Sequence, residues 1–375
     1  MIRYLEKKEY SACIPLWKEA FPEDSSQFRD YYFNKKLPGS RVLVKEDCQG
    51  RILTMAHLNP YNIKVKGFLW QLSYIVGVAT AADSRHQGHM RDVLLRMMRD
   101  MNSAGQPFCY LMPASPDIYR PFGFEYIFDQ PLWQADRKAL RVYEERRLGL
   151  EEAPEMLASW MNDWLKARFQ VYALRDKSYM EMLQAELDSE NGQVSGWFDE
   201  NGGLMALRAE WGMEKREQRF LYCREDNWAL PAASGPSSRP AIMARITDIA
   251  SMVQPICVNE DCPCGAMEVM IQIKDSLIPE NEGLWLWRLE KDGSSLSRAG
   301  KHIPVQETAG REARPAVRTA GQELLVSTEV LSATVEQLTS WLFGYRELET
   351  VLGEKPPFWC GYIETLKGVF LDEVV

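Results

Sequence analysis

The sequence predicts an α+β protein of three units, with mixed, mostly antiparallel sheets flanked by helices. The chain has 375 residues, and because single domains usually hold about 100 to 200 residues, it is too long for one ordinary core. Short β-rich runs follow amphipathic helical runs, and this order recurs coarsely after residue 134. We therefore expect units at residues 1–134, 135–240 and 241–375.

The first unit begins with two helical patterns and continues with β-rich runs. Leu37-Pro38-Gly39 breaks the helical pattern, and Asn59-Pro60 and Lys66-Gly67 separate the runs that follow. Such residues mark turns between antiparallel strands. The expected helices cover residues 7–21 and 25–34, and the expected strands start at residue 41 and cover 51–58, 61–65 and 68–80.

An amphipathic helix is predicted next, because apolar residues recur at the spacing of one helix face and Gly105 follows them. The apolar residues of this helix are Met90, Val93, Leu94, Met97, Met98 and Met101. Apolar runs at residues 108–112 and 122–128 then predict two more strands.

The rest of the chain repeats this order less regularly. The second unit is predicted to contain helices at 153–169 and 177–190 and three strands around glycine turns, and residues 232–240 form a linker rich in small residues. The third unit is predicted to contain a helix at 242–253, strands at 268–274, 284–289 and near 323–327, and a helix after Ser332.

Composition excludes several classes of protein. No segment approaches the roughly 20 apolar residues of a membrane span, and the N-terminus is charged from Arg3 onward, without the apolar core of a signal peptide. Eight scattered cysteines suit a reducing compartment. We expect a cytoplasmic protein.

The acidic charge balance bears on possible partners. A formal net charge of −9 opposes nucleic-acid binding, which depends on clustered Lys and Arg. A cationic small molecule is electrostatically easier to bind. Many proteins are acidic for solubility alone, so the charge excludes partners more than it identifies them.

The most informative stretch is residues 76–91, where a strand enters a turn and the predicted helix begins. Backbone N–H groups at a helix N-terminus lack intrahelical acceptors and favour anions such as pyrophosphate. Gly88 allows close approach of the backbone, and Arg85 and Arg91 add charged donors. A plain helix start with two surface arginines is the structural alternative.

Arg85-x-x-Gly88, preceded by a strand of small residues and followed by an amphipathic helix, resembles motif A of the GNAT acetyltransferases, with Met90 where that family usually has a small residue. Together with Tyr119-Arg-Pro-Phe-Gly-Phe124 and the three-unit layout, the chain resembles the enhanced-intracellular-survival (Eis) family. This resemblance implies tandem GNAT folds, a C-terminal sterol-carrier-protein-like α+β domain, and hexamers.

The resemblance also implies one acetyl-CoA site, in the first unit. The strand would hold the pantetheine, the turn would hold the pyrophosphate, and two residues after the next strand would lie nearby. The implied residues are Val78, Ala79, Thr80, Arg85, His86, Gln87, Gly88, His89, Met90, Arg91, Ala114 and Ser115. The second unit lacks such a turn before a helix and should not bind CoA.

Two catalytic groups follow from the same resemblance. Tyr119 would be the general acid for the leaving sulfur, since a phenol with a pKa near 10 stays protonated beside a thiol near 8.5. The C-terminal carboxylate of Val375 would be the base that deprotonates the acceptor amine. The alternatives are a core tyrosine and a frayed tail.

The expected function is acetyl transfer from acetyl-CoA to a primary amine of an aminoglycoside-like or other polyamine acceptor, or of lysine. Cys257, Cys262 and Cys264 lack a fourth ligand at zinc spacing, so no metal is expected. Two alternatives stay open: a non-catalytic CoA- or lipid-binding protein, and transfer of a longer acyl or an aminoacyl group.

Overall fold

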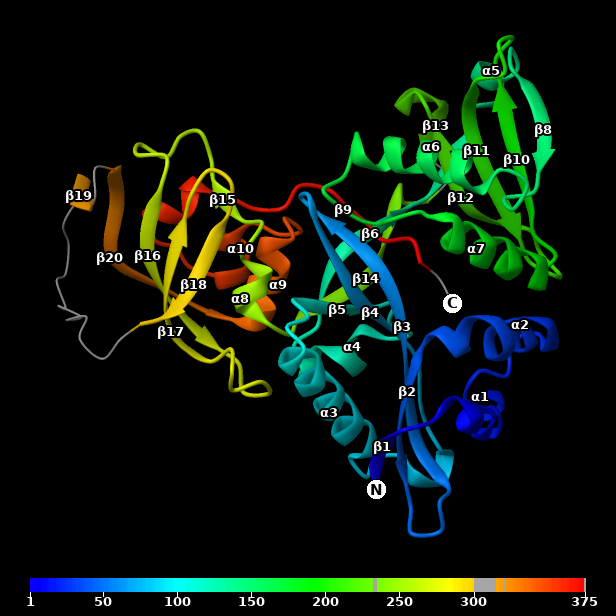
Figure 1. Ribbon diagram of the computed structural model, residues 1–375, viewed down its shortest axis with the longest axis horizontal. Coiled ribbons are helices and arrows are strands. Elements are labelled where there is room, and N and C mark those ends of the chain that lie inside the picture. The colour runs from blue at the N-terminus through cyan, green and yellow to red at the C-terminus, as the bar shows by residue number, and fades with distance from the viewer. Residues whose placement is uncertain (232–234, 300–314, 320–321, 374–375) are drawn as a thin grey trace.

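The computed structural model describes residues 1–231, 235–299, 315–319 and 322–373, and it contains three groups of elements (Figure 1). A nine-stranded sheet lies in the middle. A four-stranded sheet with its helices lies at the upper right of the view, and a five-stranded sheet lies at the left. The prediction of an α+β protein with mostly antiparallel sheets flanked by helices is confirmed.

The central sheet has the strand order β1-β2-β3-β4-β5-β14-β6, with β9 beside β3 and β22 beside β9. Its pairs are antiparallel except β4–β5 and β9–β22. The strands are β1 (Ile2–Tyr4), β2 (Arg41–Glu46), β3 (Ile52–Val65), β4 (Phe68–Thr80), β5 (Phe108–Leu111), β6 (Glu125–Pro131), β9 (Val171–Ala173), β14 (Ser238–Ile246) and β22 (Val369–Phe370).

Helices cover both faces of this sheet. On one face α3 (His89–Ser103) buries the predicted apolar stripe against Ala56, Ile75 and Leu111, beside α4 (Pro116–Tyr119) and η5 (Arg120–Phe122). The other face is covered by η1 (Lys7–Cys13), α1 (Ile14–Ala20), α2 (Ser26–Tyr31), η2 (Tyr32–Lys36), η3 (Leu37–Gly39) and the second unit. The predicted helices 7–21 and 25–34 correspond to these segments.

One predicted break is wrong, because β3 runs without interruption through Asn59-Pro60. Its partner β2 ends opposite Leu58, and its other partner on that side, β9, begins opposite Ile63. Pro60 therefore lies where that edge of β3 pairs with no strand among the described residues. A proline without an N–H is tolerated at such a position.

The second unit consists of the sheet β12-β11-β10-β8 and two main helices. Helix α7 contacts both α2 and η2 of the first unit. The elements are β7 (Trp133–Ala135), α5 (Arg137–Leu140), β8 (Glu144–Leu148), α6 (Pro154–Lys166), α7 (Lys177–Ser189), β10 (Gln193–Phe198), β11 (Leu204–Trp211), β12 (Glu217–Cys223), η6 (Asp226–Trp228) and β13 (Ala229–Pro231). The two predicted helices and three strands are present.

The third unit is built on the sheet β18-β17-β16-β20-β19, in which only β16 and β20 are parallel. Helix α9 contacts β14 and β6 of the central sheet. The elements are α8 (Ile249–Met252), β15 (Cys257–Val258), β16 (Met267–Lys274), β17 (Gly283–Leu289), β18 (Ser294–Arg298), β19 (Pro315–Thr319), β20 (Gln322–Thr334), α9 (Val335–Leu342), α10 (Leu348–Leu352), η7 (Phe358–Tyr362) and β21 (Ile363–Glu364).

The predicted helix at 242–253 is wrong, since residues 242–246 belong to β14, between β5 and β6, and only 249–252 are helical. A short apolar run that is buried on both faces looks the same in a helix and in a central strand. The predicted boundary after residue 240 consequently falls inside β14. The division into units at 134 and 240 stays a prediction.

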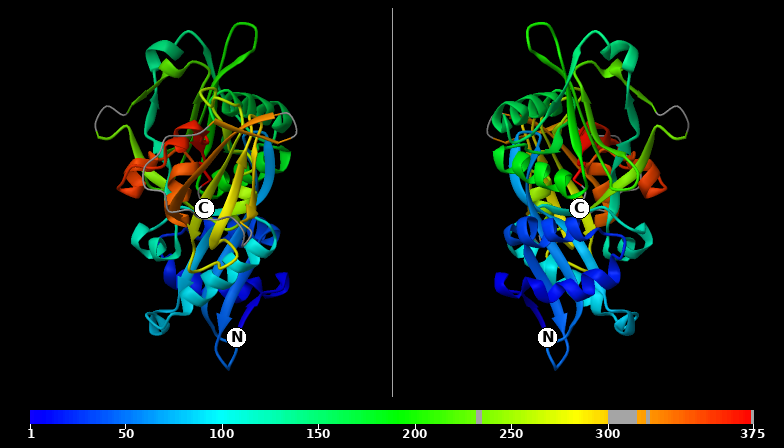
Figure 2. Two further views of the ribbon diagram at one scale, coloured as in Figure 1. Left: turned by 90° about the vertical axis from the view of Figure 1, so that its left-hand side faces the viewer. Right: turned by 90° about the vertical axis from the view of Figure 1, so that its right-hand side faces the viewer.

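The C-terminal segment returns from the third unit to the other two (red in Figures 1 and 2). Its strand β22 pairs in parallel with β9, and β9 pairs with β3. Leu371, Asp372 and Glu373 are buried after this strand. Residues from the far end of the chain therefore lie beside the central sheet.

Candidate active site

A β-bulge near the end of β4 shapes the first part of the site. Val76 pairs with His57 and Ala79 with Met55, so two residues of β4 face one residue of β3. Gly77, inside the bulge, has φ +59°, and a Cβ there would lie 2.5 Å from a ring carbon of Trp17. Only glycine fits this backbone and this contact.

Strands β4 and β5 diverge beyond the bulge. They pair only where Tyr74 lies opposite Tyr110, so the edge of β4 from that point to Thr80 has no strand partner within the described part of the chain. Unpaired backbone groups on a strand edge are available to hydrogen-bond an extended ligand. The predicted pantetheine-binding residues Val78, Ala79 and Thr80 lie on this segment.

The turn from β4 into α3 has the shape of an anion site. His86 and Gly88 both have left-handed backbones, with φ +61° and +79°, and Gly88 is the N-cap of α3. A Cβ added to Gly88 would meet no atom within 4 Å. The first amides of α3 therefore face open space beside the positive end of the helix dipole.

Charged side chains around this turn favour an anion. The acidic residues Asp83 and Asp92 form ion pairs with Arg51 and Lys45. Arg85 and Arg91 are exposed, and no ion pair engages either of them in the ranges the structure describes. The turn thus keeps two cations available for phosphate oxygens.

His89 provides a further sign that this turn fits a ligand. Its Nδ1 is buried and has no hydrogen-bond partner among the described residues. A buried polar atom without a hydrogen-bond partner is uncommon in native proteins. Because His89 begins α3, the open donor or acceptor lies where the resemblance places the pyrophosphate.

The remaining predicted residues follow β5 on the same face as α3. Ala114 and Ser115 form the loop that leads into α4, where Ser115 is the N-cap. Tyr119 is 8% exposed, packs edge-on against Phe124, and belongs to the apolar cluster of α3. Burial raises the pKa of Tyr119 to about 12, so its hydroxyl carries a proton at neutral pH.

Val375, the predicted base, lies outside the described residues, which reach Glu373 at this end of the chain. The structure does describe Asp372 and Glu373, the residues of the tail just before it. Arg175 binds both Asp372 and Glu373, at 2.5 and 2.7 Å, and its side chain has no exposed surface. Glu373 Oε2 is buried without a hydrogen-bond partner in the described chain, and burial raises the pKa of this carboxyl.

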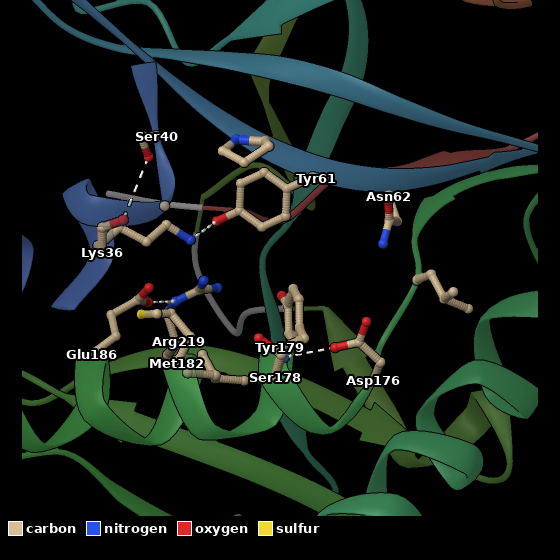
Figure 3. A pocket seen from close by; sticks show the side chains of 14 residues that line it. Lys36, Ser40, Tyr61, Asn62, Asp176, Ser178, Tyr179, Met182, Glu186 and Arg219 are labelled. Atoms are coloured by element: carbon tan, nitrogen blue, oxygen red, sulfur yellow. Dashed lines mark hydrogen bonds and ion pairs between the residues drawn. The ribbon is translucent and has the colours of Figure 1, made fainter. Parts of the chain in front are cut away.

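A cavity of about 210 Å³ lies on the opposite side of the sheet, between the first and second units (Figure 3). Lys36 points into it and donates to the Tyr61 hydroxyl at 2.7 Å. Below them in Figure 3, Arg219 donates to Glu186 at 3.0 Å. Burial lowers the pKa of Lys36, which stands among these groups.

Aromatic rings connect this cavity to the point where β4 and β5 diverge. Tyr61 lines the cavity and packs edge-on against Tyr74, and Tyr74 stacks on Tyr110 with ring centroids 5.1 Å apart. The Tyr110 hydroxyl is buried without a partner among the described residues. Tyr179, also in the cavity wall, donates to Glu373 at 3.3 Å.

Sequence reasoning did not find this cavity. Its wall comes from η2, β3, α7 and β12, which are far apart in the chain and carry no shared motif. The aromatic run Tyr31-Tyr32-Phe33, which leads into η2, does not line the cavity, and Tyr32 is fully buried against Trp17 and His57. The one signal that the sequence offers is its apolar ending, Phe370-Leu371-Asp-Glu-Val-Val375, because an apolar run argues against a frayed tail.

Two features of the described chain bear on other functions. No helix in the described ranges is both long and apolar enough to cross a membrane. The described residues contain no group of three or more His, Cys, Asp or Glu arranged to hold a metal ion. Cys262 and Cys264, next to Cys257, are free thiols.

The sequence of the first unit matches a known domain family. Residues 1–127 match the model described as acetyltransferase (GNAT) domain. Together with the fold, this match confirms the prediction of an acyl-CoA-dependent acetyltransferase domain. No curated protein is significantly similar to the chain in sequence.

Solved structures share the fold over nearly the whole chain. A probable N-acyltransferase from Enterococcus faecalis has 15% identity and a TM-score of 0.71 over 97% of this chain and 93% of its own. A GCN5-related N-acetyltransferase from Kribbella flavida has 13% identity and a TM-score of 0.69 over 100% and 98%. Eis1 from Mycobacterium abscessus has 12% identity and a TM-score of 0.65 over 100% and 99%.

Proposed function

We propose that this chain, which contains a GNAT acetyltransferase domain, transfers an acetyl group from acetyl-CoA to a primary amine. The observation that carries the proposal is the divergence of β4 from β5 beyond Tyr74. The anion-binding turn and Tyr119 lie on the α3 face of this divergence, and the cavity of Lys36 and Tyr61 lies on the other face. The two substrates would then approach from opposite sides of one sheet.

The α3 face supplies the groups that acetyl-CoA needs. The pyrophosphate would bind the amides of Gly88 to Arg91, and the pantetheine would follow the edge of β4. Backbone N–H groups of Val78 or Thr80 would stabilise the negative charge that develops on the thioester oxygen. Acetyl-CoA is a substrate here, and no metal is required by these roles.

The chemical step needs one acid and one base. The amine nitrogen bonds to the thioester carbon, the carbon–sulfur bond breaks, and the sulfur takes the proton of the Tyr119 hydroxyl. The amine gives its own proton to a carboxylate. We assign that base to the terminal carboxyl of Val375, and the preceding residues support this, since the tail that carries it is fixed by Arg175 and its Glu373 accepts from Tyr179 of the cavity wall.

Charge beside the cavity supports a cationic acceptor. A second cavity, of about 220 Å³, lies one turn of α7 away and has walls from α1–α2 and the second unit. Four carboxylates line it together with Trp211, against one lysine; they are Glu23, Asp24, Glu190 and Glu217. We therefore propose a polyamine-type acceptor, aminoglycoside-like or lysine, whose second ammonium is held there.

The wider assignment follows the same resemblance. We propose an Eis-like enzyme whose residues 241–375 form the sterol-carrier-protein-like domain, working in the cytoplasm as a homo-oligomer. Support comes from the full-length fold similarity to Eis1. Sedimentation of the purified chain tests the hexamer.

Calorimetric titration with acetyl-CoA, followed by release of CoA thiol with an amine panel, tests the function. We expect about one equivalent of acetyl-CoA per chain and faster thiol release with an aminoglycoside or a polyamine. Gly88→Asp should weaken binding about tenfold or more, because it places an anion at the phosphate turn. Gly202→Asp is the matched control, since both glycines have positive φ and open space at Cβ.

Two results would contradict the proposal. Absence of acetyl-CoA binding would favour the non-catalytic alternative, with ligands of the third unit to be tested next. Binding without transfer to any amine, but transfer from longer acyl-CoA, would favour the acyltransferase alternative.

A further inference from the structure

A lysine, a cysteine and a glutamate meet where the first unit contacts the third. Lys66 is in the turn between β3 and β4 and has φ +43°. Its Nζ lies 2.8 Å from Cys257 Sγ in β15 and 3.6 Å from Glu364 in β21. Cys257 and Glu364 are partners across the β15–β21 pair, and Cys257 Sγ lies 3.3 Å from the Glu364 carboxylate.

The nitrogen–sulfur distance is unusually short. An N–H···O bond is typically about 2.9 to 3.0 Å long, and sulfur is a larger atom than oxygen. The other hydrogen bonds that involve sulfur in the described chain are longer: Arg224 donates to Met205 Sδ at 3.7 Å, and the thiols of Cys257, Cys109 and Cys262 donate to oxygens at 3.3, 3.9 and 3.9 Å. Lys66 and Cys257 are therefore held closer than hydrogen bonding alone requires.

The site is sheltered but open to a small oxidant. Cys257 itself is only 2% exposed, whereas the side chains of Lys66 and Glu364 are each 26% exposed. Because the two side chains that contact the sulfur are partly exposed, a small oxidant such as dioxygen or hydrogen peroxide has better access to it than a large thiol reagent. A close amine then competes with further oxidation of the sulfur.

We propose that Lys66 and Cys257 form a reversible oxidative cross-link in which one oxygen atom joins Nζ to Sγ. With dioxygen, the ammonium and the thiol give an N–O–S bridge, one water and one proton. One oxygen atom enters the bridge and the other leaves as water, while nitrogen and sulfur together lose four electrons. Glu364 takes the released proton, and a thiol reductant restores the two side chains.

The place of the link gives it a consequence for the acceptor site. It ties the β3–β4 turn to the β15–β21 pair, from which the chain runs on to β22 and to Glu373, which accepts from Tyr179 of the cavity wall. Oxidation would therefore fix the base of the segment that carries the proposed catalytic carboxyl. The inference concerns regulation of the proposed function, and it is tested without measuring activity.

The test is intact-mass spectrometry of the full chain after exposure to dilute hydrogen peroxide, two molecules of which replace one dioxygen in this step and leave three waters instead of one. We expect a gain of one oxygen with loss of two hydrogens, reversed by dithiothreitol, and a cross-linked peptide pair containing Lys66 and Cys257. Lys66→Arg keeps the positive charge and should abolish this product, as should Cys257→Ser. The matched control Cys262→Ser removes a neighbouring buried thiol and should leave it unchanged.

Thermal unfolding gives an independent readout. Oxidised wild-type protein should melt several degrees above its reduced form, since the link closes a long loop, and Lys66→Arg should show no such difference. Oxygen addition that persists in Lys66→Arg would overturn the proposal, because it would be ordinary cysteine or methionine oxidation. Loss of two hydrogens without oxygen would also overturn it, as it indicates a disulfide or a direct N–S bond.

Discussion

The two faces of the central sheet carry the two halves of the proposed site, and they are built differently. The α3 face is apolar beneath and polar only at one turn, where consecutive residues from Arg85 to Arg91 supply the donors. The opposite face buries ionised groups from distant segments, among them Arg175, Arg219 and Glu373. One half depends on local backbone shape and the other on long-range ion pairing.

Because of this difference, the two halves should respond differently to substitutions. A helix N-terminus persists as long as its helix packs, so the phosphate turn tolerates most side-chain changes around it. A buried ion cluster fails when one member is removed, because the remaining charges stay desolvated. Substitutions on the α3 face should therefore mainly affect catalysis, whereas substitutions in the buried ion cluster of the opposite face should mainly affect stability.

The largest expected effect is on the buried face. Arg175→Met leaves Asp372 and Glu373 buried without their cation and should lower the free energy of unfolding by about 3 to 5 kcal/mol. Urea denaturation measures it. Arg288→Met, which breaks the exposed pair with Glu290, is the control and should cost less than about 1 kcal/mol. Equal losses in both variants would contradict the buried-cluster account.

On the α3 face, Tyr119→Phe should leave the fold and acetyl-CoA affinity nearly unchanged and lower turnover by about 10²-fold or more, as expected for loss of a general acid. The matched control is Tyr126→Phe in the following strand. Because the pKa of Tyr119 is about 12, wild-type turnover should show no loss of this acid up to about pH 10. Unchanged turnover in Tyr119→Phe would remove its catalytic role.

The same contrast explains what could be predicted from the sequence. The α3 half lies within one stretch of strand, turn and helix, and each step there has a local signal: the glycine at Gly88, the arginines, and the apolar stripe of the helix. The structure confirms the strand, the turn and the helix, and the binding role of these residues stays a prediction. The cavity half is formed by Lys36, Tyr61, Tyr179 and Arg219, whose neighbourhood depends on how whole units pack.

The fold shows the same limit on a larger scale. The run Ile242 to Ile246 was misassigned because its environment, between β5 and β6, comes from residues more than 100 positions earlier. Arg245 looks like a surface residue in sequence, but its side chain is fully buried against Asp275. Tertiary packing decides whether such a segment forms a helix or a strand and which of its side chains are buried, and no local sequence pattern reveals this.

His57, at the bulge between the two halves, predicts a pH effect of intermediate size. Burial lowers its pKa to about 3, whereas in the unfolded chain it should be near 6.5. Between these values the unfolded state binds the extra proton, so stability is complete above about pH 6.5 and falls as the pH decreases. The loss from this residue should reach about 2 kcal/mol at pH 5.

Denaturation of wild-type protein and His57→Phe at pH 7 and pH 5 measures this effect. The variant should lose less stability than the wild type over that interval, because it no longer has the titrating ring. His86→Gln, at an exposed position of the phosphate turn, is the control, and its free energy of unfolding should change between pH 7 and pH 5 as much as that of the wild type. An equal change in the free energy of unfolding of all three proteins between pH 7 and pH 5 would contradict a neutral, buried His57.

Substitutions in the acidic second cavity should have the smallest effect, and they distinguish binding of the acceptor from the roles of the two sheet faces. Glu23 and Glu217 are exposed at its rim, and removing exposed charges costs up to about 1 kcal/mol each. Glu23→Gln with Glu217→Gln should therefore raise KM for a polyamine several-fold. The KM for acetyl-CoA and for a monoamine should stay the same.

Salt provides the physical check on this last prediction. Raising ionic strength screens exposed charges over about 10 Å or less, so the wild-type KM for the polyamine should rise toward that of the double variant, whose own KM should change little. Glu200→Gln, in an exposed turn of the second unit, is the matched control and should behave as wild type. An equal rise in KM for the monoamine would show that these carboxylates act on the shape of the site, because a charge effect requires the second ammonium.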